Sequence, residues 1–340
     1  MSLSRPGGRT QPAGAWRPAP RVRARASARP RADASTSAPA APLPVVILPG
    51  LGNAATDYAP LAAALRLRGA PAVAIAPVTR PDWLRNAAGL VRPEYWTGRL
   101  TPLPTTAWYM DRIDSAVADA LEAAAAAGGV GGQGNNKVAL VAHSAGGWLA
   151  RTWLLERGGA SSTASLATLG SPHAPPPPGS GLPDQTRGIL TWVEANCPGA
   201  FHADIAYTTV AARYLRGAPL LGGRDGGGSG AAPVTLAARL AGAGYAAVCG
   251  RADVWGDAIT PVQSAHLAGA RQVTLDGVFH GPLGATPDPE GVGGAAVSEE
   301  GAAPRFWYGS ASVIDLWAPE ALGLAPLGGR LLAASRGGGK

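Results

Sequence analysis

The stretch that decides the fold is KVALVAHSAGGWLARTWLLER, residues 137–157. Its first part, residues 138–142, is a short continuous apolar run, which is typical of a strand buried on both faces of a parallel sheet. From Ala145 onward the side chains at 148, 149, 152 and 155 follow a helical spacing, and Gly158-Gly159 supplies a stop. The sequence therefore predicts a strand, a tight turn and a helix, with Ser144 at the turn.

The turn itself, Ala142-His143-Ser144-Ala145-Gly146, resembles the nucleophile elbow of the α/β-hydrolases. That elbow reads G-x-S-x-G because the strand and helix backbones pass close together, so the residues two before and two after the serine must be small. Alanine stands at the first of these positions here. Ser162 and Ser229 also fit a relaxed form of the pattern, but neither follows an apolar strand run and opens a helix.

Apolar runs alternate with amphipathic segments on both sides of this stretch. Residues 44–48 and 72–76 predict buried strands that flank a helix from about residue 56 to Gly69. Residues 108–127 predict a helix with one apolar stripe, and residues 164–169 predict a further strand. Residues 80–107 indicate a long, aromatic loop. This β-α alternation predicts an α/β fold with a mostly parallel sheet and helices on both faces, the α/β-hydrolase architecture.

Residues 174–243 interrupt the alternation, which predicts a cap or lid insertion containing helices at 184–194 and 205–215. Beyond it we expect a strand at 245–249, a helix at 262–268 and a last strand at 271–275. Residues 284–304 are rich in Gly, Ala and Pro and indicate a flexible insertion. Residues 306–322 indicate a closing helical region. The predicted domains are thus a disordered segment at 1–42, a hydrolase domain at 43–325 and a C-terminal tail at 326–340.

An acid follows the run at 245–249, in the phrase GRADVWGDAITP. The hydrolase pattern places the acid three or four residues ahead of a proline, and Asp257 fits it best; Asp253 is the alternative. Only His266 and His280 follow Asp257, and His266 falls inside a predicted helix. The resemblance therefore implies that His280, after the last strand, is the histidine of the site.

Two other histidines have less support. His173 ends the phrase TLGSPH, which resembles a segment of many lipases, but it precedes both candidate acids, whereas the expected chain order places the histidine after the acid. We therefore expect it in a loop or pocket wall. His202 lies inside the predicted insertion and receives no role.

Longer phrases narrow the resemblance, which covers about residues 44–325. LPGLGNAATDY, DWLRNAAGL, AHSAGGWLAR and CGRADVWGD resemble the plant and algal plastid lipase-like hydrolases related to GPI inositol-deacylases. This resemblance implies a serine hydrolase that cleaves a carboxylic ester, with Ser144, Asp257 and His280 as a catalytic triad. It also implies an oxyanion hole made by the backbone N–H groups of Leu51 and Ala145. No cofactor or metal is implied.

Two further hypotheses remain open at this stage. The same triad serves acyl transfer and thioester cleavage, so an acyltransferase or thioesterase is an alternative. A hydrolase scaffold that only binds ligands is another, although none of the three triad residues is missing. In each case we expect a small hydrophobic ester or lipid as the ligand, and we infer no obligate protein partner.

The formal net charge of +7 resides in one segment. Residues 1–42 hold eight arginines and a single acid, Asp33, so the rest of the chain is formally neutral. A neutral domain lacks the electrostatic footprint that phosphate binding requires, which argues against a nucleic-acid partner. An Arg-rich, Ser-rich and acid-poor start is typical of an organelle transit peptide, and its Pro and Gly content favours a chloroplast. A retained disordered tail is the alternative.

The cysteine count and the apolar runs set further limits. Two cysteines, Cys197 and Cys249, are too few for a disulfide framework and wrongly spaced for a metal site; a bridge between them is not favoured. No apolar run approaches the ~18 residues of a membrane span, which predicts a soluble protein or one in peripheral membrane contact.

Overall fold

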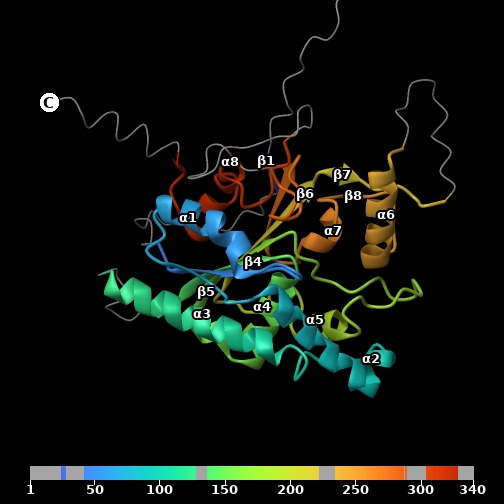
Figure 1. The fold of residues 1–340 in the computed structure, drawn as a ribbon, viewed down its shortest axis with the longest axis horizontal. Helices are drawn as coiled ribbons and strands as arrows, with labels where there is room; N and C mark the ends of the chain where they lie inside the picture. Colours follow the sequence, from blue (N-terminus) through green and yellow to red (C-terminus); the bar gives the residue numbers. More distant parts are fainter. Residues whose placement is uncertain are drawn as a thin grey trace, which may run out of the picture.

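The computed structural model describes residues 42–127, 136–221, 234–286, 288 and 304–327, and the backbone of residues 24–27. A seven-stranded sheet in the order β1-β9-β6-β5-β4-β2-β3 forms its centre (Figure 1). The strands are β1 (Ala24–Ser27), β2 (Val45–Leu48), β3 (Val73–Ile75), β4 (Val138–His143), β5 (Thr163–Leu169), β6 (Ala206–Arg213) and β9 (Arg271–Asp276). Six of them are parallel, and β1 pairs antiparallel with β9.

Helices cover both faces of this sheet. One face carries α1 (Ala59–Leu67), α8 (Ala311–Ile314) and α9 (Ala318–Leu322), and the other carries α3 (Ala107–Ala126) and α4 (Ala145–Glu156) (Figure 1). Alternate residues of β2 enter the two cores: Val45 and Ile47 pack on the α1 side, Val46 and Leu48 on the α3 side. Burial on both faces is why these strands appear in the sequence as unbroken apolar runs.

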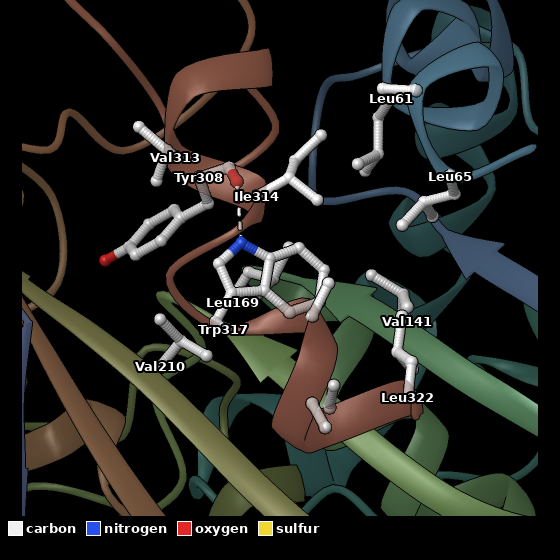
Figure 2. Close-up of a cluster of buried hydrophobic side chains, with 14 of the residues drawn as sticks. Leu61, Leu65, Val141, Leu169, Val210, Tyr308, Val313, Ile314, Trp317 and Leu322 are labelled. Atoms are coloured by element: carbon white, nitrogen blue, oxygen red, sulfur yellow. Dashed lines mark hydrogen bonds between the residues drawn. The ribbon is translucent and has the colours of Figure 1, made fainter. Parts of the chain in front are cut away.

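The core on the α1 side is built around aromatic side chains from the C-terminal segment. Trp317 and Tyr308 are fully buried there, and the indole N–H of Trp317 donates to the Tyr308 carbonyl at 2.9 Å (Figure 2). Leu61 and Leu65 of α1 pack in the same cluster (Figure 2). The closing segment at 306–322 is therefore part of the core, which ties the end of the described chain to the first helix.

The remaining elements are short or lie between core strands. They are the 3-10 helices η1 (Ala55–Tyr58), η2 (Arg80–Val91) and η4 (Gly159–Ser162), the helices α2 (Pro93–Trp96), α5 (Ile189–Asn196), α6 (Leu236–Cys249) and α7 (Val262–Ala265), and the two-residue strands β7 (Leu215–Arg216) and β8 (Trp255–Gly256).

The strand order reverses direction between β2 and β4. From β2 the chain passes through α1 to β3 on one side, then through α3 to β4 on the other side of β2. In α/β sheets, ligands bind at the carboxyl ends of the strands beside such a switch point. The loop after β2 begins at Pro49, and the turn after β4 holds Ser144, so both lie at this edge of the sheet.

Two predicted elements are wrong in type, and both are Ala-rich. Residues 205–215, predicted as a helix, form the core strand β6, and residues 245–249, predicted as a strand, are the end of the helix α6. Between Tyr207 and Ala212 every residue of β6 is buried, so no alternation distinguishes a strand from a helix. The Thr235 side chain caps α6 by accepting from the Ala238 N–H at 3.1 Å, and Gly250 ends it with a left-handed backbone.

The single cap insertion predicted at 174–243 is therefore divided by a core strand. One excursion leaves β5 and returns to β6 through α5, and a second leaves β6 and carries β7, α6 and β8 before Asp257. Two predicted helices are also shorter than expected. The helix predicted at 184–194 begins at Ile189, because the Asp184 carboxylate instead accepts from the Thr186 and Thr191 N–H groups. The helix predicted at 262–268 ends at Ala265.

The predicted disordered segment 1–42 differs from expectation at four residues, Ala24–Ser27, which form β1. Residues 1–23 and 28–41 lie outside the described residues, as do most of the predicted insertion at 284–304 and residues 328–340 of the predicted tail. Cys197 and Cys249 are both buried and unpaired with each other. Within the described ranges, no helix combines the length and apolarity that crossing a bilayer requires.

Candidate active site

Ser144 occupies a strained turn between β4 and α4. Its backbone angles are φ 51° and ψ −124°, a region that residues with a side chain rarely adopt. The close approach behind it requires Gly146, where an added Cβ would lie 2.6 Å from the Leu48 carbonyl oxygen. The small residue predicted at this position is thus explained by the backbone of β2, and the turn has the geometry of a nucleophile elbow.

The loop after β2 lies directly against this serine. An added Cβ at Gly50 would be 2.8 Å from the Cβ of Ser144, so no larger residue fits there. Aromatic side chains fix the loop: the Tyr109 hydroxyl donates to the Pro49 carbonyl at 2.6 Å, and the Tyr58 hydroxyl accepts from the Gly50 N–H at 2.9 Å. Buried residues therefore hold the backbone of this loop in one position beside the serine.

The two predicted oxyanion donors sit at the ends of these segments. The Ala145 N–H is the first of α4 and has no acceptor within the helix. No hydrogen bond joins the Leu51 N–H to another described residue, and the Leu51 side chain is 63% exposed. Neither N–H group therefore has an acceptor among the described residues.

The structure brings Ser144, Asp257 and His280 together. The Nε2 atom of His280 is 3.0 Å from Ser144 Oγ, and its Nδ1 atom is 2.8 Å from Asp257 Oδ2. The side chain of Asp257 is 1% exposed and that of His280 is 12% exposed. The acid is therefore shielded from water, whereas the histidine borders the open side of the site.

Each oxygen of the Asp257 carboxylate accepts two hydrogen bonds. Oδ1 accepts from the Thr260 and Ile259 N–H groups at 2.7 and 3.0 Å, and Oδ2 accepts from His280 and from the Tyr308 hydroxyl at 2.9 Å. Burial by itself would raise the pKa of Asp257, but His280 and the two backbone donors outweigh it and hold the pKa below its ordinary value. Asp257 is therefore held as a carboxylate that fixes the orientation of the imidazole.

Tyr308 is a site residue that sequence reasoning missed. It lies in the closing segment, 51 residues beyond Asp257 in the chain, and no motif marks it. Burial first, and then the Asp257 charge, raise the pKa of its hydroxyl well above the ordinary value, so it remains a hydrogen-bond donor to the carboxylate.

Gly170, at the end of β5, was also missed as a site residue. Its φ is 58°, and an added Cβ would lie 2.5 Å from Asp257 Oδ2 and 3.2 Å from His280 Nδ1. The TLGSPH phrase noted in the sequence thus contributes a glycine that makes room for the Asp257–His280 pair.

The other candidates lie elsewhere. Asp253, the alternative acid, is exposed and pairs with Arg251 at 3.3 Å. His266 follows α7 and contacts the hydroxyls of Thr209 and Thr274. His173, expected in a loop or pocket wall, is 1% exposed and contacts the Thr168 hydroxyl at 3.0 Å, so it lies within the protein. His202 contacts the Tyr207 hydroxyl at 2.9 Å, outside the site.

A cavity of about 520 Å³ adjoins the acid and histidine loops. Its lining is mostly apolar: α6 contributes residues that include Leu240, Ala241 and Val248, and the acid and histidine loops contribute Ala258, Ile259 and Phe279. Gln185 and Arg305 also line it. A cavity of this size and lining suits the apolar part of a small ligand. Among the described residues, no group of His, Cys, Asp or Glu side chains is arranged to hold a metal ion.

Comparison with known proteins gives matches in structure alone. No family model and no curated protein matches the sequence. The Bacillus licheniformis lipase BlEst2 matches over 74% of this chain and 87% of its own, at 15% identity and a TM-score of 0.37. A pyrethroid hydrolase from Sphingobium faniae matches over 39% of this chain and 41% of its own (19% identity, TM-score 0.24).

The RedJ thioesterase of the prodiginine biosynthetic pathway in Streptomyces coelicolor matches over 55% of this chain and 77% of its own, at 24% identity and a TM-score of 0.27. The assignment of the fold rests on the molecule's own geometry. Six parallel strands run in the order β9-β6-β5-β4-β2-β3, with helices on both faces and a strained serine turn after β4. This protein has the α/β-hydrolase fold.

Proposed function

We propose that this protein is a serine hydrolase that cleaves a carboxylic ester carrying an apolar group. The observation that carries the proposal is the hydrogen-bonded row from Asp257 through His280 to Ser144, at 2.8 and 3.0 Å. A serine hydroxyl is a weak nucleophile at neutral pH and needs a base within this distance to take its proton.

The proposed reaction follows from the roles of these groups. Ser144 Oγ attacks the ester carbonyl carbon while His280 Nε2 takes its proton, and Asp257 stabilises the resulting imidazolium through Nδ1. The carbonyl oxygen becomes an oxyanion that the Leu51 and Ala145 N–H groups stabilise. His280 then returns the proton to the leaving alcohol, which gives an acyl-Ser144 enzyme. Water attacks the acyl group in the same manner, and the carboxylic acid leaves.

The cavity beside α6 supports an apolar substrate. Its wall continues from Ala258 and Ile259, next to the acid, to Phe279, next to the histidine. We therefore place the hydrocarbon part of the ester in this cavity, which favours a lipid ester over a small polar one. We also propose that the protein is related to the lipase-like hydrolases of plant and algal plastids, and the sequence phrases quoted above support this relationship.

The test of the reaction is covalent labelling of the full chain with a fluorophosphonate probe, together with hydrolysis of p-nitrophenyl esters. Ser144→Ala should abolish both. Ser162→Ala is the matched control, because Ser162 fits the relaxed motif but its hydroxyl donates to the Gly159 carbonyl in η4. Labelling that persists in Ser144→Ala, or no labelling of the parent, would refute the nucleophile.

The test of the substrate class compares p-nitrophenyl acetate, octanoate and palmitate. Ala241→Phe fills the cavity and should lower kcat/KM for the two longer esters by about tenfold or more, with little change for acetate. Leu236→Phe is the matched control, since Leu236 lies on the same helix, is 71% exposed and is absent from the cavity lining. Equal losses on all three esters would contradict this placement.

We also propose that the protein acts in a plastid, supported by the basic, acid-poor composition of residues 1–42. A fluorescent fusion of these residues should enter chloroplasts, and replacing the eight arginines with glutamine should prevent entry. Because β1 lies in this segment and pairs with β9, its removal would expose an edge of the sheet.

A further inference from the structure

His143, the residue immediately before the serine, is buried among the groups that make the site. Its side chain contacts the Tyr58 hydroxyl and the loop after β9. The Nδ1 atom is 2.6 Å from the Tyr58 hydroxyl, and the Nε2 atom is 2.8 Å from the backbone carbonyl oxygen of His280. The Tyr58 hydroxyl in turn accepts from the Gly50 N–H at 2.9 Å. A single row of hydrogen bonds therefore runs from the loop after β2 to the loop after β9.

The donors and acceptors of this row follow from its two ends. The carbonyl oxygen of His280 can only accept, so His143 carries a proton on Nε2 and donates it there. In the neutral ring Nδ1 then accepts from the Tyr58 hydroxyl, whose oxygen accepts from the Gly50 N–H. These roles are satisfied by one neutral tautomer of His143 and leave no unpaired donor or acceptor along the row.

The packing on each side of the imidazole gives an independent observation. An added Cβ at Gly50 would lie 2.8 Å from His143 Nδ1, and one at Gly281 would lie 3.1 Å from His143 Cε1. The loop after β2 therefore approaches the ring so closely that only glycine fits at position 50, and at Gly281 an added Cβ would make a tight contact with the ring. Because the ring fills the space between the two loops, it determines their separation as well as their hydrogen bonding.

We propose that His143 is a positioning residue which, through Tyr58, fixes the backbone of the oxyanion loop and the backbone of His280 relative to Ser144. This inference rests on the proposed function. The Leu51 N–H follows Gly50 directly, and His280 must keep both of its ring nitrogens in line with Asp257 and Ser144. Loss of the row releases both loops, and a displacement of about 1 Å at reacting groups costs about 100-fold in rate.

The charge state of His143 supports this role. Burial, and then the neighbouring His280, lower the pKa of His143 to about 3. The rings of His143 and His280 lie 4.9 Å apart between centroids, so a neutral His143 does not oppose the positive charge that His280 gains during the reaction. A lysine or arginine at this position would oppose it.

The experiment measures kcat and KM with p-nitrophenyl octanoate for the full-length parent and the variants Tyr58→Phe, His143→Leu and the double variant. The matched control is Tyr207→Phe, which removes another tyrosine–histidine hydrogen bond, the 2.9 Å contact with His202, outside the site. Tyr58→Phe keeps the aromatic ring that packs on Trp307, so it remains informative if His143→Leu does not fold. An alkyl boronic acid, which forms a tetrahedral adduct with an active serine, reports on the oxyanion loop.

We expect each single variant to lower kcat by about 10- to 100-fold, with KM within about threefold. Because both residues act through one row, the double variant should lose little more than the worse single variant. Boronic acid affinity should fall in parallel with kcat, and Tyr207→Phe should match the parent. A general loss of folding would instead lower the fraction of active protein and leave the boronic acid affinity of that fraction unchanged.

Suppose that the fluorophosphonate probe labels the parent. The inference is then overturned if the kcat of Tyr58→Phe lies within about threefold of the kcat of Tyr207→Phe. Fully multiplicative losses in the double variant would also overturn it, since they indicate separate effects. A parent that the probe does not label instead refutes the proposed function, and this inference with it.

Discussion

Gly170→Ala tests whether the end of β5 makes room for the acid and histidine. The added Cβ would lie 2.5 Å from Asp257 Oδ2 and 2.9 Å from a ring carbon of Tyr308, against about 3.5 Å for an ordinary contact. Something must therefore move by about 1 Å, and the Asp257–His280 pair is what the methyl group meets. A shift of about this size predicts a loss of about 100-fold in kcat.

The matched control is Gly158→Ala. Gly158 has a φ of 65°, close to the 58° of Gly170, but an added Cβ there meets nothing within 4 Å. Both variants should lose about 1–2 kcal/mol of stability from the left-handed backbone, measured by urea unfolding. Only Gly170→Ala should also lose activity on p-nitrophenyl octanoate. If its kcat stays within about threefold of that of Gly158→Ala, the steric reasoning is wrong.

Three further predictions concern the surroundings of the site. Tyr308→Phe removes the 2.9 Å hydrogen bond to Asp257 Oδ2 and should lower kcat by about tenfold at unchanged KM. An unchanged kcat in steady-state kinetics would contradict this, because it would show that the other three hydrogen bonds are enough to hold Asp257. Trp317→Phe removes the indole N–H bond to the Tyr308 carbonyl and part of a fully buried ring. Urea unfolding should therefore show that the free energy of unfolding falls by about 2 kcal/mol, and a fall of less than about 0.5 kcal/mol would contradict this. Burial lowers the pKa of His143 to about 3 and the pKa of His266 to about 4, below the unfolded value of 6.5. The unfolded chain therefore binds these two protons more strongly than the folded protein does. Stability that is fully present above pH 6.5 is consequently lost as the pH falls. Each histidine should cost about 2 kcal/mol at pH 5, and equal urea midpoints at pH 5 and pH 8 would refute the sign.

The parts of the fold that sequence reasoning predicted are those in which local pattern and tertiary environment agree. The run before Ser144 and the helix after it were predicted because small residues at Ala142 and Gly146 separate two clear periods. The chain order of serine, acid and histidine then selected Asp257 and His280, and in the structure His280 lies within hydrogen-bond distance of both Asp257 and Ser144.

The errors occurred where alanine removes the difference between a strand and a helix. Between Tyr207 and Ala212 every residue of β6 is buried on either face, and in α6 the apolar residues at 245–249 are the last part of a longer helix. Intrinsic preference is weak in both, so the neighbouring strands β5 and β9 decide the conformation of 206–213. That information is absent from the local sequence.

The supporting residues of the site could not be predicted for a related reason. Tyr308, Gly170 and His143 act through contacts with residues at least 51 positions away in the chain, and each would be ordinary core composition if the fold were different. The position of His143 beside the serine was visible, but its link to Tyr58 and to the His280 carbonyl depends on how three loops meet.

The excursion between β6 and Asp257 begins and ends at nearly the same place. The Tyr214 N–H donates to the Gly256 carbonyl at 2.9 Å, the Gly217 N–H donates to the Val254 carbonyl at 2.9 Å, and β7 pairs with β8 between them. These bonds close the excursion next to the acid loop, and Tyr245 of α6 also contacts that loop, because its hydroxyl accepts from the Ala258 N–H at 2.9 Å. An altered excursion would therefore have to keep a tyrosine at position 245 to hold the acid loop, while cavity-lining positions of α6 such as Leu240 and Val248 could vary to change substrate preference.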